Sequence, residues 1–158
     1  MHRKGLNSRR SAAASGPYAG KGLIVWSVNF FAKPGEPEAN AASILRWIGR
    51  AFRSGAGKAS RQRPDFILFP EMCVSGYVNT ASELCAIREG VETALAALLA
   101  ASENIPETLL LVGYPFYSGN AVYIRHSVIQ KGEFLFHHDK TALSPHESRT
   151  FSPGCGVK

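Results

Sequence analysis

The chain has 158 residues, of which 45% are hydrophobic and 19% are charged, and this is the composition of a globular protein rather than of a disordered chain. The net charge is +6, but residues 1–22 contribute five basic residues and no acid, so the rest is nearly neutral and we expect no nucleic-acid partner. No apolar run reaches the roughly 20 residues that a membrane-spanning helix needs, which argues against a membrane protein.

The sequence divides into a basic tail and one folded part. Residues 1–21 are predicted to form a basic flexible tail, and residues 22–158 the folded portion. The tail is rich in Arg, Ser and Ala, a composition found both in solvated termini and in mitochondrial transit peptides. We favour the solvated terminus and a cytoplasmic protein, with mitochondrial targeting as the alternative. Three cysteines without a CxxC pair or a secretory signal favour free thiols in a reducing compartment.

The first half of the folded part predicts a strand, a helix and a second strand. The segment "GLIVWSVNF" (22–30) is a short apolar run dense in β-formers, which indicates a buried strand. The segment "NAASILRWIGRAF" (40–52) repeats apolar residues with helical spacing, and Asn40 is a candidate helix cap. Residues 53–64 are predicted to be a solvated loop, since their basic residues have no aromatic residue among them to stack on bases. The run "DFILF" (65–69) is the second predicted strand.

The second half predicts one helix and three strands. Residues 82–102 carry a helical apolar stripe, and "TLLLVGYPF" (108–116) is a third buried strand with Gly113 marking its end. Residues 120–130 and 133–138 flank a Lys-Gly turn and are predicted to form a hairpin. The order β-α-β-α-β-β-β predicts an α/β sandwich with a mixed sheet.

Three charged residues follow the predicted strands at ends where open α/β sheets hold their ligands. Glu71 follows the second strand, Lys140 follows the hairpin, and Glu147 lies in the irregular segment beyond it. A carboxylate there can accept a proton from a nucleophile, and a lysine can stabilise negative charge on a tetrahedral intermediate. For any one of these acids, an exposed salt bridge is the commoner role. The set lacks a nucleophile.

Residues of the metal-binding type also gather near the end of the hairpin. They are His137, His138, Asp139 and His146. Adjacent residues on a strand point to opposite faces, so His137 and His138 are poorly placed to share an ion. The segment "GAGKAS" (55–60) lacks the full frame of a phosphate-binding loop. We therefore expect no metal and no cofactor.

Taken in order, these segments resemble the N-terminal half of the nitrilase superfamily, the carbon–nitrogen hydrolases, from about residue 22 to residue 154. "DFILFPEMCVSGY" is similar to the segment that bears the family's catalytic glutamate. "YIRHSVIQKGEFLFHHDKTALSP" resembles the hairpin that leads to the catalytic lysine, and "HESRTFSPG" the loop with a second glutamate. The resemblance implies a nitrilase-like α-β-β-α sandwich, here incomplete because the C-terminal strands are missing.

The resemblance also implies roles in a Glu-Lys-Cys catalytic triad. Glu71 is the expected general base that activates a cysteine thiol, Lys140 the group that stabilises the tetrahedral intermediate, and Glu147 a supporting glutamate. The implied reaction is hydrolysis of a non-peptide C–N bond in a small amide or nitrile, through a covalent thioester or thioimidate. A homo-oligomer is an expectation that the resemblance adds.

The chain departs from the family pattern at the nucleophile. The family's cysteine lies on an elbow well past the Phe-x-Pro-Gly segment, and this sequence ends at Lys158, so we expect the chain by itself to be inactive. Cys155 is a weak substitute because no strand precedes it, and Cys73 is expected to pack locally. Arg125 and His126 stand where the family usually has a small or amide residue. The alternatives are a catalytically inactive family fragment with a binding or association role, and an amine N-acyltransferase.

Overall fold

The computed structural model describes residues 22–53, 63–78 and 80–155. The tail expected at residues 1–21 and most of the loop expected at 53–64 lie outside this part of the chain. The described helices and strands are β1 (Val25–Ser27), α1 (Pro37–Arg53), β2 (Phe66–Leu68), α2 (Ala81–Ala86), α3 (Arg88–Glu103), β3 (Leu109–Ser118), β4 (Ala121–Gln130), β5 (Glu133–Asp139) and the 3₁₀ turn η1 (Glu147–Arg149).

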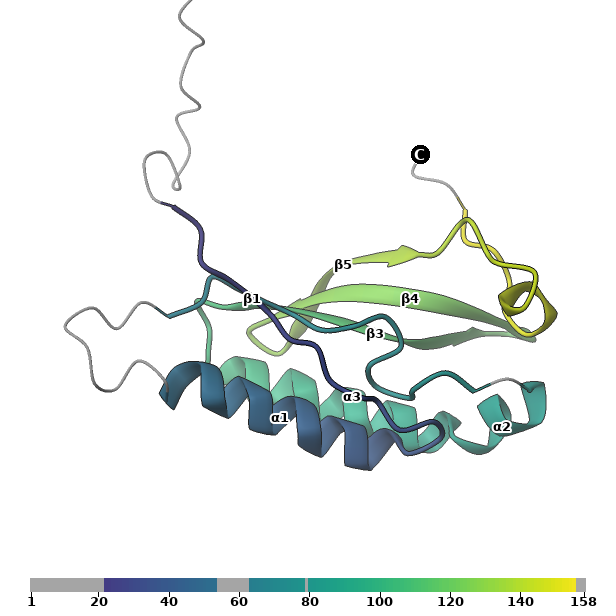
Figure 1. Cartoon of the computed structure of the whole chain (residues 1–158), viewed down its shortest axis with the longest axis horizontal. Coiled ribbons are helices and arrows are strands. Elements are labelled where there is room, and N and C mark those ends of the chain that lie inside the picture. The colour runs from purple at the N-terminus through teal and green to yellow at the C-terminus, as the bar shows by residue number, and fades with distance from the viewer. Residues whose placement is uncertain (1–21, 54–62, 79, 156–158) are drawn as a thin grey trace, which may run out of the picture.

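The strands form one mixed sheet of five, in the spatial order β1-β2-β3-β4-β5. β1, β2 and β3 are parallel, whereas β4 and β5 run antiparallel to their neighbours. Helical sequence separates the parallel strands, and a two-residue connection suffices between antiparallel ones. Figure 1 shows α1 and α3 side by side along one face of this sheet. The predicted α/β fold with a mixed sheet is confirmed.

The hydrophobic core lies between the two long helices and the sheet. Ile44 and Ile48 of α1, which belong to the predicted apolar face, are at most 6% exposed. Val91 and Leu98 of α3 meet them at the sheet, where Ile67 is fully buried. Spacing of three, four and seven residues places these side chains on single helix faces, and their burial stabilises both helices against the sheet. None of the described helices is long and apolar enough to cross a membrane.

The opposite face of the sheet carries a row of apolar side chains that we call the open-face row. Strand register aligns Leu68, Leu111, Val128 and Phe136 across four strands. Leu68 is 36% exposed and Phe136 is 61% exposed. Because side chains alternate along a strand, this row points away from the helix-covered neighbours, such as Ile67. No described helix covers the open-face row (Figure 1).

The prediction of a single helix over residues 82–102 is wrong, because the structure has two helices there. α2 begins at a capping box in which Thr80 accepts a hydrogen bond from the main chain of Glu83 and the Glu83 side chain reaches back to Thr80. Ile87 separates α2 from α3 with φ −93° and ψ 0°, outside the helical region. The apolar stripe continues across this break, which is why its periodicity did not reveal it.

The expected strand end at Gly113 is also wrong. β3 continues to Ser118 because its pairing with β4 runs without a break from Leu110 opposite Ile129 to Ser118 opposite Ala121. Gly113 has a different role. A Cβ atom there would lie 2.7 Å from the main-chain nitrogen of Met72, so only glycine lets the segment after β2 cross directly over β3.

The predicted hairpin between β4 and β5 is confirmed. Its turn residues, Lys131 and Gly132, have φ of 52° and 80°. Positive φ at both central positions is the geometry that matches the right-handed twist of the two strands.

Candidate active site

A tight main-chain crossing positions Glu71. The segment that follows β2 hydrogen-bonds to β3, with Val74 N donating to Gly113 O at 3.1 Å. Within the same turn, Cys73 N donates to Pro70 O at 3.2 Å. These contacts hold Glu71 above the sheet on the same face as the open-face row, beyond the end of β2.

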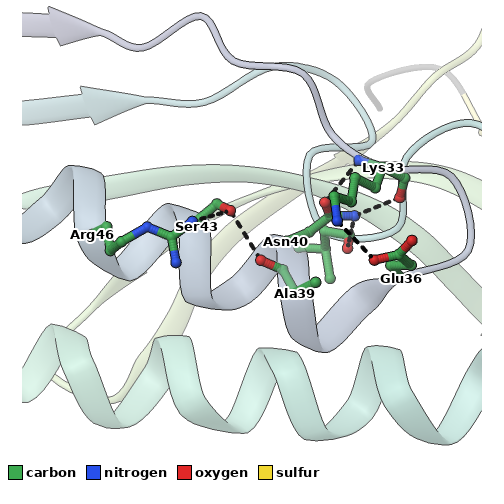
Figure 2. Close-up of polar contacts among 7 residues, drawn as sticks. Lys33, Glu36, Ala39, Asn40, Ser43 and Arg46 are labelled. Atoms are coloured by element: carbon green, nitrogen blue, oxygen red, sulfur yellow. Dashed lines mark hydrogen bonds and ion pairs between the residues drawn. The ribbon is translucent and has the colours of Figure 1, made fainter.

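Asn40 fixes the other side of this turn. Contrary to the expectation from the sequence, it does not cap α1, because α1 already begins at Pro37. Its side chain accepts a hydrogen bond from Lys33 N at 2.8 Å, donates to Lys33 O at 2.8 Å, and donates to Val74 O at 3.1 Å. Figure 2 shows this buried amide at the start of α1, between the loop that follows β1 and the chain after Glu71. Asn40 therefore anchors the glutamate turn to the helix layer.

Main-chain contacts also position Lys140, directly after β5. Its N–H donates to Ile124 O at 2.9 Å, and its carbonyl accepts from Gly154 N at 2.9 Å. The Phe-x-Pro-Gly segment thus packs against the strand end. Successive side chains point to opposite faces of a strand, so the side chain of Lys140 lies on the face opposite to that of Asp139. This is the sheet face that holds Glu71.

The structure brings Glu71, Lys140 and Glu147 together around one ammonium group. Lys140 Nζ donates to Glu71 Oε2 at 3.2 Å and to Glu147 Oε1 at 2.8 Å. The other oxygen of Glu147 accepts from Ser144 N at 2.8 Å. The hydrogen bond to Glu147 raises the pKa of Lys140 above its ordinary value, and the bond to Lys140 holds the pKa of Glu147 below its own. The lysine therefore stays charged at neutral pH.

Tyr77 is a fourth member of this cluster, which the sequence analysis did not single out. Its hydroxyl donates to Glu71 Oε2. Burial raises the pKa of Tyr77, and the bond to Glu71 raises it further, so the phenol remains a donor at neutral pH. The sequence signal for Tyr77 was the Gly-Tyr pair at the end of "DFILFPEMCVSGY", which places a hydroxyl group six residues after Glu71.

The three cysteines lie outside the lining of the cavity that holds Glu71 and Lys140. Cys73 is buried, its Sγ donates to Gly113 O at 3.4 Å, and burial raises the pKa of the thiol to about 12, which indicates a packing role. Cys85 is exposed on α2. Cys155 is exposed and lines a cavity of about 390 Å³ with residues such as Asp139, whereas Glu71 and Lys140 line another cavity of about 250 Å³. No cysteine of the described chain lines that second cavity.

Arg125 has a structural partner at the end of the hairpin. Its guanidinium forms two hydrogen bonds to the Asp139 carboxylate, at 2.6 and 2.8 Å, and stacks 3.3 Å from the centre of the Phe116 ring. The bond to Arg125 holds the pKa of Asp139 below its ordinary value. This pair ties β4 to β5 one residue before Lys140. In the described part of the chain, no three His, Cys, Asp or Glu side chains cluster closely enough to hold a metal ion.

Neither a protein-family model nor a curated protein matches the sequence, but solved structures match the fold. An amidase from Nesterenkonia sp. is 25% identical, with a TM-score of 0.68 over 84% of this chain and 48% of its own. A mutant of the Nesterenkonia AN1 amidase, described as a nitrilase-superfamily protein, has a TM-score of 0.66 at 25% identity, over 84% of this chain and 48% of its own. A glutamine-dependent NAD+ synthetase from Acinetobacter baumannii is 21% identical, with a TM-score of 0.67 over 83% of this chain and 24% of its own.

These comparisons define the class of fold. Over most of its length the chain has the fold of the nitrilase superfamily, the carbon–nitrogen hydrolases, and the resemblance seen in the sequence is confirmed at this level. The chain spans about half the length of the amidases and about a quarter of the NAD+ synthetase.

Proposed function

We propose that the chain carries the glutamate–lysine part of the active site of a carbon–nitrogen hydrolase of the amidase or nitrilase type, which acts on non-peptide C–N bonds of small molecules. The observation that carries this proposal is the cluster around Lys140 Nζ. It joins carboxylates 69 and seven residues away in the sequence. Similarity to amidases of this fold supports the same assignment.

Glu71 is the general base in this proposal. Its side chain is 37% exposed and lines the cavity of about 250 Å³, so one face of the carboxylate is open to a reacting group. Lys140 and Tyr77 both donate to Oε2 and thereby hold the carboxylate in one orientation. The other oxygen, Oε1, is the atom that would accept a proton from a thiol or a water.

Lys140 stabilises developing negative charge. Its ammonium lies in the same cavity as Glu71 and carries three donor protons, of which the two carboxylates take two. The third proton is available for the oxyanion of a tetrahedral intermediate. Glu147, whose side chain is 11% exposed, fixes the ammonium in position and balances its charge.

The proposed reaction has two halves. In the first, Glu71 takes the proton of a cysteine thiol as its sulfur attacks the amide carbon, and the C–N bond then breaks as Glu71 returns the proton to the leaving amine. In the second, Glu71 takes a proton from water, which attacks the thioester carbon, and the C–S bond then breaks as Glu71 returns the proton to the leaving sulfur, which releases the acid and the free thiol. Because no cysteine among the described residues lines the cavity, we propose that the thiol comes from outside these 158 residues and that this chain alone is inactive.

The decisive experiment measures hydrolysis of butyramide and butyronitrile by the purified chain. We expect turnover at background and no difference between the wild type and Cys155→Ser. Robust turnover that Cys155→Ser abolishes would overturn the assignment and make Cys155 the nucleophile.

The role of Glu71 is tested in a gene product that supplies the thiol. There, Glu71→Gln should lower kcat about 10²- to 10⁴-fold, which is the usual contribution of a general base. The matched control is Glu36→Gln, because Glu36 also pairs with a lysine but lies exposed at the start of α1, away from the cavity. Equal activity of Glu71→Gln and Glu36→Gln would contradict the assignment.

A second candidate function is association with another protein surface. The observation that favours it is the open-face row, in which Phe136 is 61% exposed, together with Val25 of β1, which is 54% exposed. Exposed apolar side chains of this size on one sheet face mark an interaction surface. The chain would then serve as a binding partner without chemistry of its own.

A further inference from the structure

The β4–β5 hairpin carries an extra residue close to the candidate site. Next to the turn, Ile129 of β4 lies opposite Phe134 of β5, but Val128, one position further from the turn, lies opposite Phe136. Leu135 is therefore the extra residue of a β-bulge, in which two residues of one strand face one residue of the other. The bulge shifts the pairing of every later residue of β5 by one position, and such a shift exchanges the two faces of the sheet.

The bulge decides on which face of the sheet Lys140 lies. In the structure Lys140 follows β5 beside Ile124, to whose carbonyl its N–H donates at 2.9 Å, and both residues line the cavity that holds Glu71. A hairpin without the bulge would continue the pairing that the turn begins, and it would place Lys140 opposite Tyr123. Tyr123 is next to Ile124, so it lies on the other face of β4, where it lines the cavity of about 390 Å³. In that register the ammonium could not reach Glu71.

Packing does little to hold the register of β5 beyond the bulge. Six of the seven residues of β5 are exposed, and the partly buried one is Asp139. A strand whose register is not fixed by burial of one face is prone to slip, and the turn fixes the register only on its own side of the bulge. Another contact must therefore select the register in which Lys140 meets Glu71.

The contact that fits this role is the pair of Arg125 and Asp139. Its two hydrogen bonds, at 2.6 and 2.8 Å, join β4 to β5 beyond the bulge, and the two side chains are only 12% and 19% exposed. The ring of Phe116 on β3 holds the guanidinium from one side, at 3.3 Å. In a register without the bulge, Arg125 would lie opposite His138, and Asp139 would lie opposite Ile124 on the other face of the sheet. The pair can therefore form only in the bulged register.

We propose that Arg125 and Asp139 are positioning residues, which lock β5 in the bulged register and thereby hold Lys140 on the face of Glu71. This inference deepens the proposed function and rests on it, since that function assigns the chemistry to Lys140 and Glu71. In the proposed mechanism neither Arg125 nor Asp139 has a chemical step of its own. The inference gives a role to Arg125, which in the sequence stood out only as a departure from the family.

The test follows the register of β5 in the 158-residue chain by NMR. Cross-strand nuclear Overhauser effects report which residue of β5 faces Arg125, and titration of the Lys140 side chain reports its contacts with the two carboxylates. In Asp139→Ala, we expect Arg125 to face His138, and the pKa of Lys140 to fall to its ordinary value of 10.5, because the carboxylates no longer hold its proton. Arg125→Asp combined with Asp139→Arg rebuilds the pair with exchanged charges and should restore both readouts.

Deletion of Leu135 separates a register lock from ordinary stabilisation. Without the bulge residue, the pairing that begins at the turn leads directly to Asp139 opposite Arg125, so the lock is no longer needed. In this background, Asp139→Ala should leave the register and the pKa of Lys140 unchanged. Equal effects of Asp139→Ala with and without Leu135 would overturn the inference, as would the wild-type register in Asp139→Ala itself. If the deletion variant does not fold, the register of Asp139→Ala still decides.

The matched control is Glu92→Gln. It removes another arginine–carboxylate pair, formed by Arg88 and Glu92 at 3.2 Å on the exposed surface of α3. The register of β5 and the pKa of Lys140 should equal those of the wild type. A changed register in this variant would show that the loss of any such ion pair loosens β5, and it would overturn the inference.

The register data separate this inference from the proposed function. The wild-type register in Asp139→Ala, in a gene product whose hydrolysis still depends on Glu71, refutes the lock and leaves the proposed function intact. Conversely, a register that depends on Asp139, in a gene product that supplies the thiol but hydrolyses neither butyramide nor butyronitrile, upholds the inference and refutes the hydrolase assignment.

Discussion

At the scale of single residues, the candidate site is a balance of charge around one lysine. Lys140 donates to two carboxylates, and one of these, Glu147, is also held by the main chain of Ser144. Glu147 is therefore fixed by two donors, whereas the Glu71 carboxylate keeps one oxygen, Oε1, for chemistry. In the proposed mechanism this asymmetry suits a base, Glu71, and a supporting acid, Glu147, because only the base would exchange its proton.

The lowered pKa of Glu147 predicts a pH-dependent contribution to stability. Lys140 and Ser144 favour the ionised carboxylate in the folded state, so the contribution is present above the ordinary pKa of 4.5 and is lost as pH falls through the lower folded value. We expect Glu147→Gln to lower the free energy of unfolding by about 1 kcal/mol at pH 7, and the difference from wild type to shrink below about pH 4. Urea unfolding at a series of pH values measures both.

The control for this prediction is Glu36→Gln. Glu36 forms an exposed ion pair with Lys33, in which both side chains are more than half exposed, so its loss should change stability little at any pH. A Glu147→Gln difference that stays constant from pH 7 to pH 3 would show that packing, not charge, accounts for it.

At the scale of elements, the glutamate turn depends on its crossing over β3. Asn40 holds the turn from the helix layer, and Gly113 leaves room for it above the sheet. Neither residue lines the cavity that holds Glu71 and Lys140, yet both determine where the carboxylate of Glu71 points.

Gly113→Ala should disrupt this crossing. The added Cβ would lie 2.7 Å from Met72 N and 3.1 Å from Pro70 O, both main-chain atoms that cannot move without displacing the turn. We expect a loss of about 2 kcal/mol in the free energy of unfolding, measured by urea denaturation, because overpacking of this kind costs about 1–3 kcal/mol. Gly22→Ala is the matched control, since its Cβ would meet nothing within 4 Å. Equal stability of both variants would show that the turn adapts.

The sequence predicted more about the elements than about their connections. Helical periodicity located α1, and alternation with a Lys-Gly turn located β4 and β5. The break at Ile87 was missed because the apolar stripe continues through it, and the length of β3 was missed because pairing with β4 outweighs the weak strand preference of glycine. Within the cluster, ordered motifs indicated Glu71, Lys140 and Glu147. Their contact depends on the strand order of the sheet, which periodicity does not encode.

At the scale of the whole molecule, the chain is two-layered, with helices on one face of the sheet and the open-face row on the other. The candidate site lies on the uncovered side, at His126, two positions before Val128 on β4. Whatever covers the open-face row would therefore also form a wall of the cavity. If both proposed functions hold, this geometry would couple association to chemistry.

The open face predicts self-association of the chain. We expect the weight-average sedimentation coefficient of the wild type to rise with protein concentration, because exposed apolar sheet faces associate in water. A double variant, Val25→Lys with Phe136→Lys, should remain monomeric, since each new charge would be buried in the interface. Phe31→Lys is the control, because Phe31 is 81% exposed but lies in a loop. A wild-type chain that stays monomeric at all concentrations would contradict the prediction.

The contact between Glu71 and Lys140 also bears on the order in which the molecule folds. The β4–β5 hairpin closes through a two-residue turn and can form within microseconds, whereas this contact joins residues 69 positions apart. This contact exists only when β2, β3, β4 and β5 have paired side by side in the sheet. A folding intermediate with intact helices and hairpin would look nearly native by circular dichroism and yet have no cluster. The ion pair thus reports on the completion of folding, and the assembled cluster should be the last feature that the chain acquires.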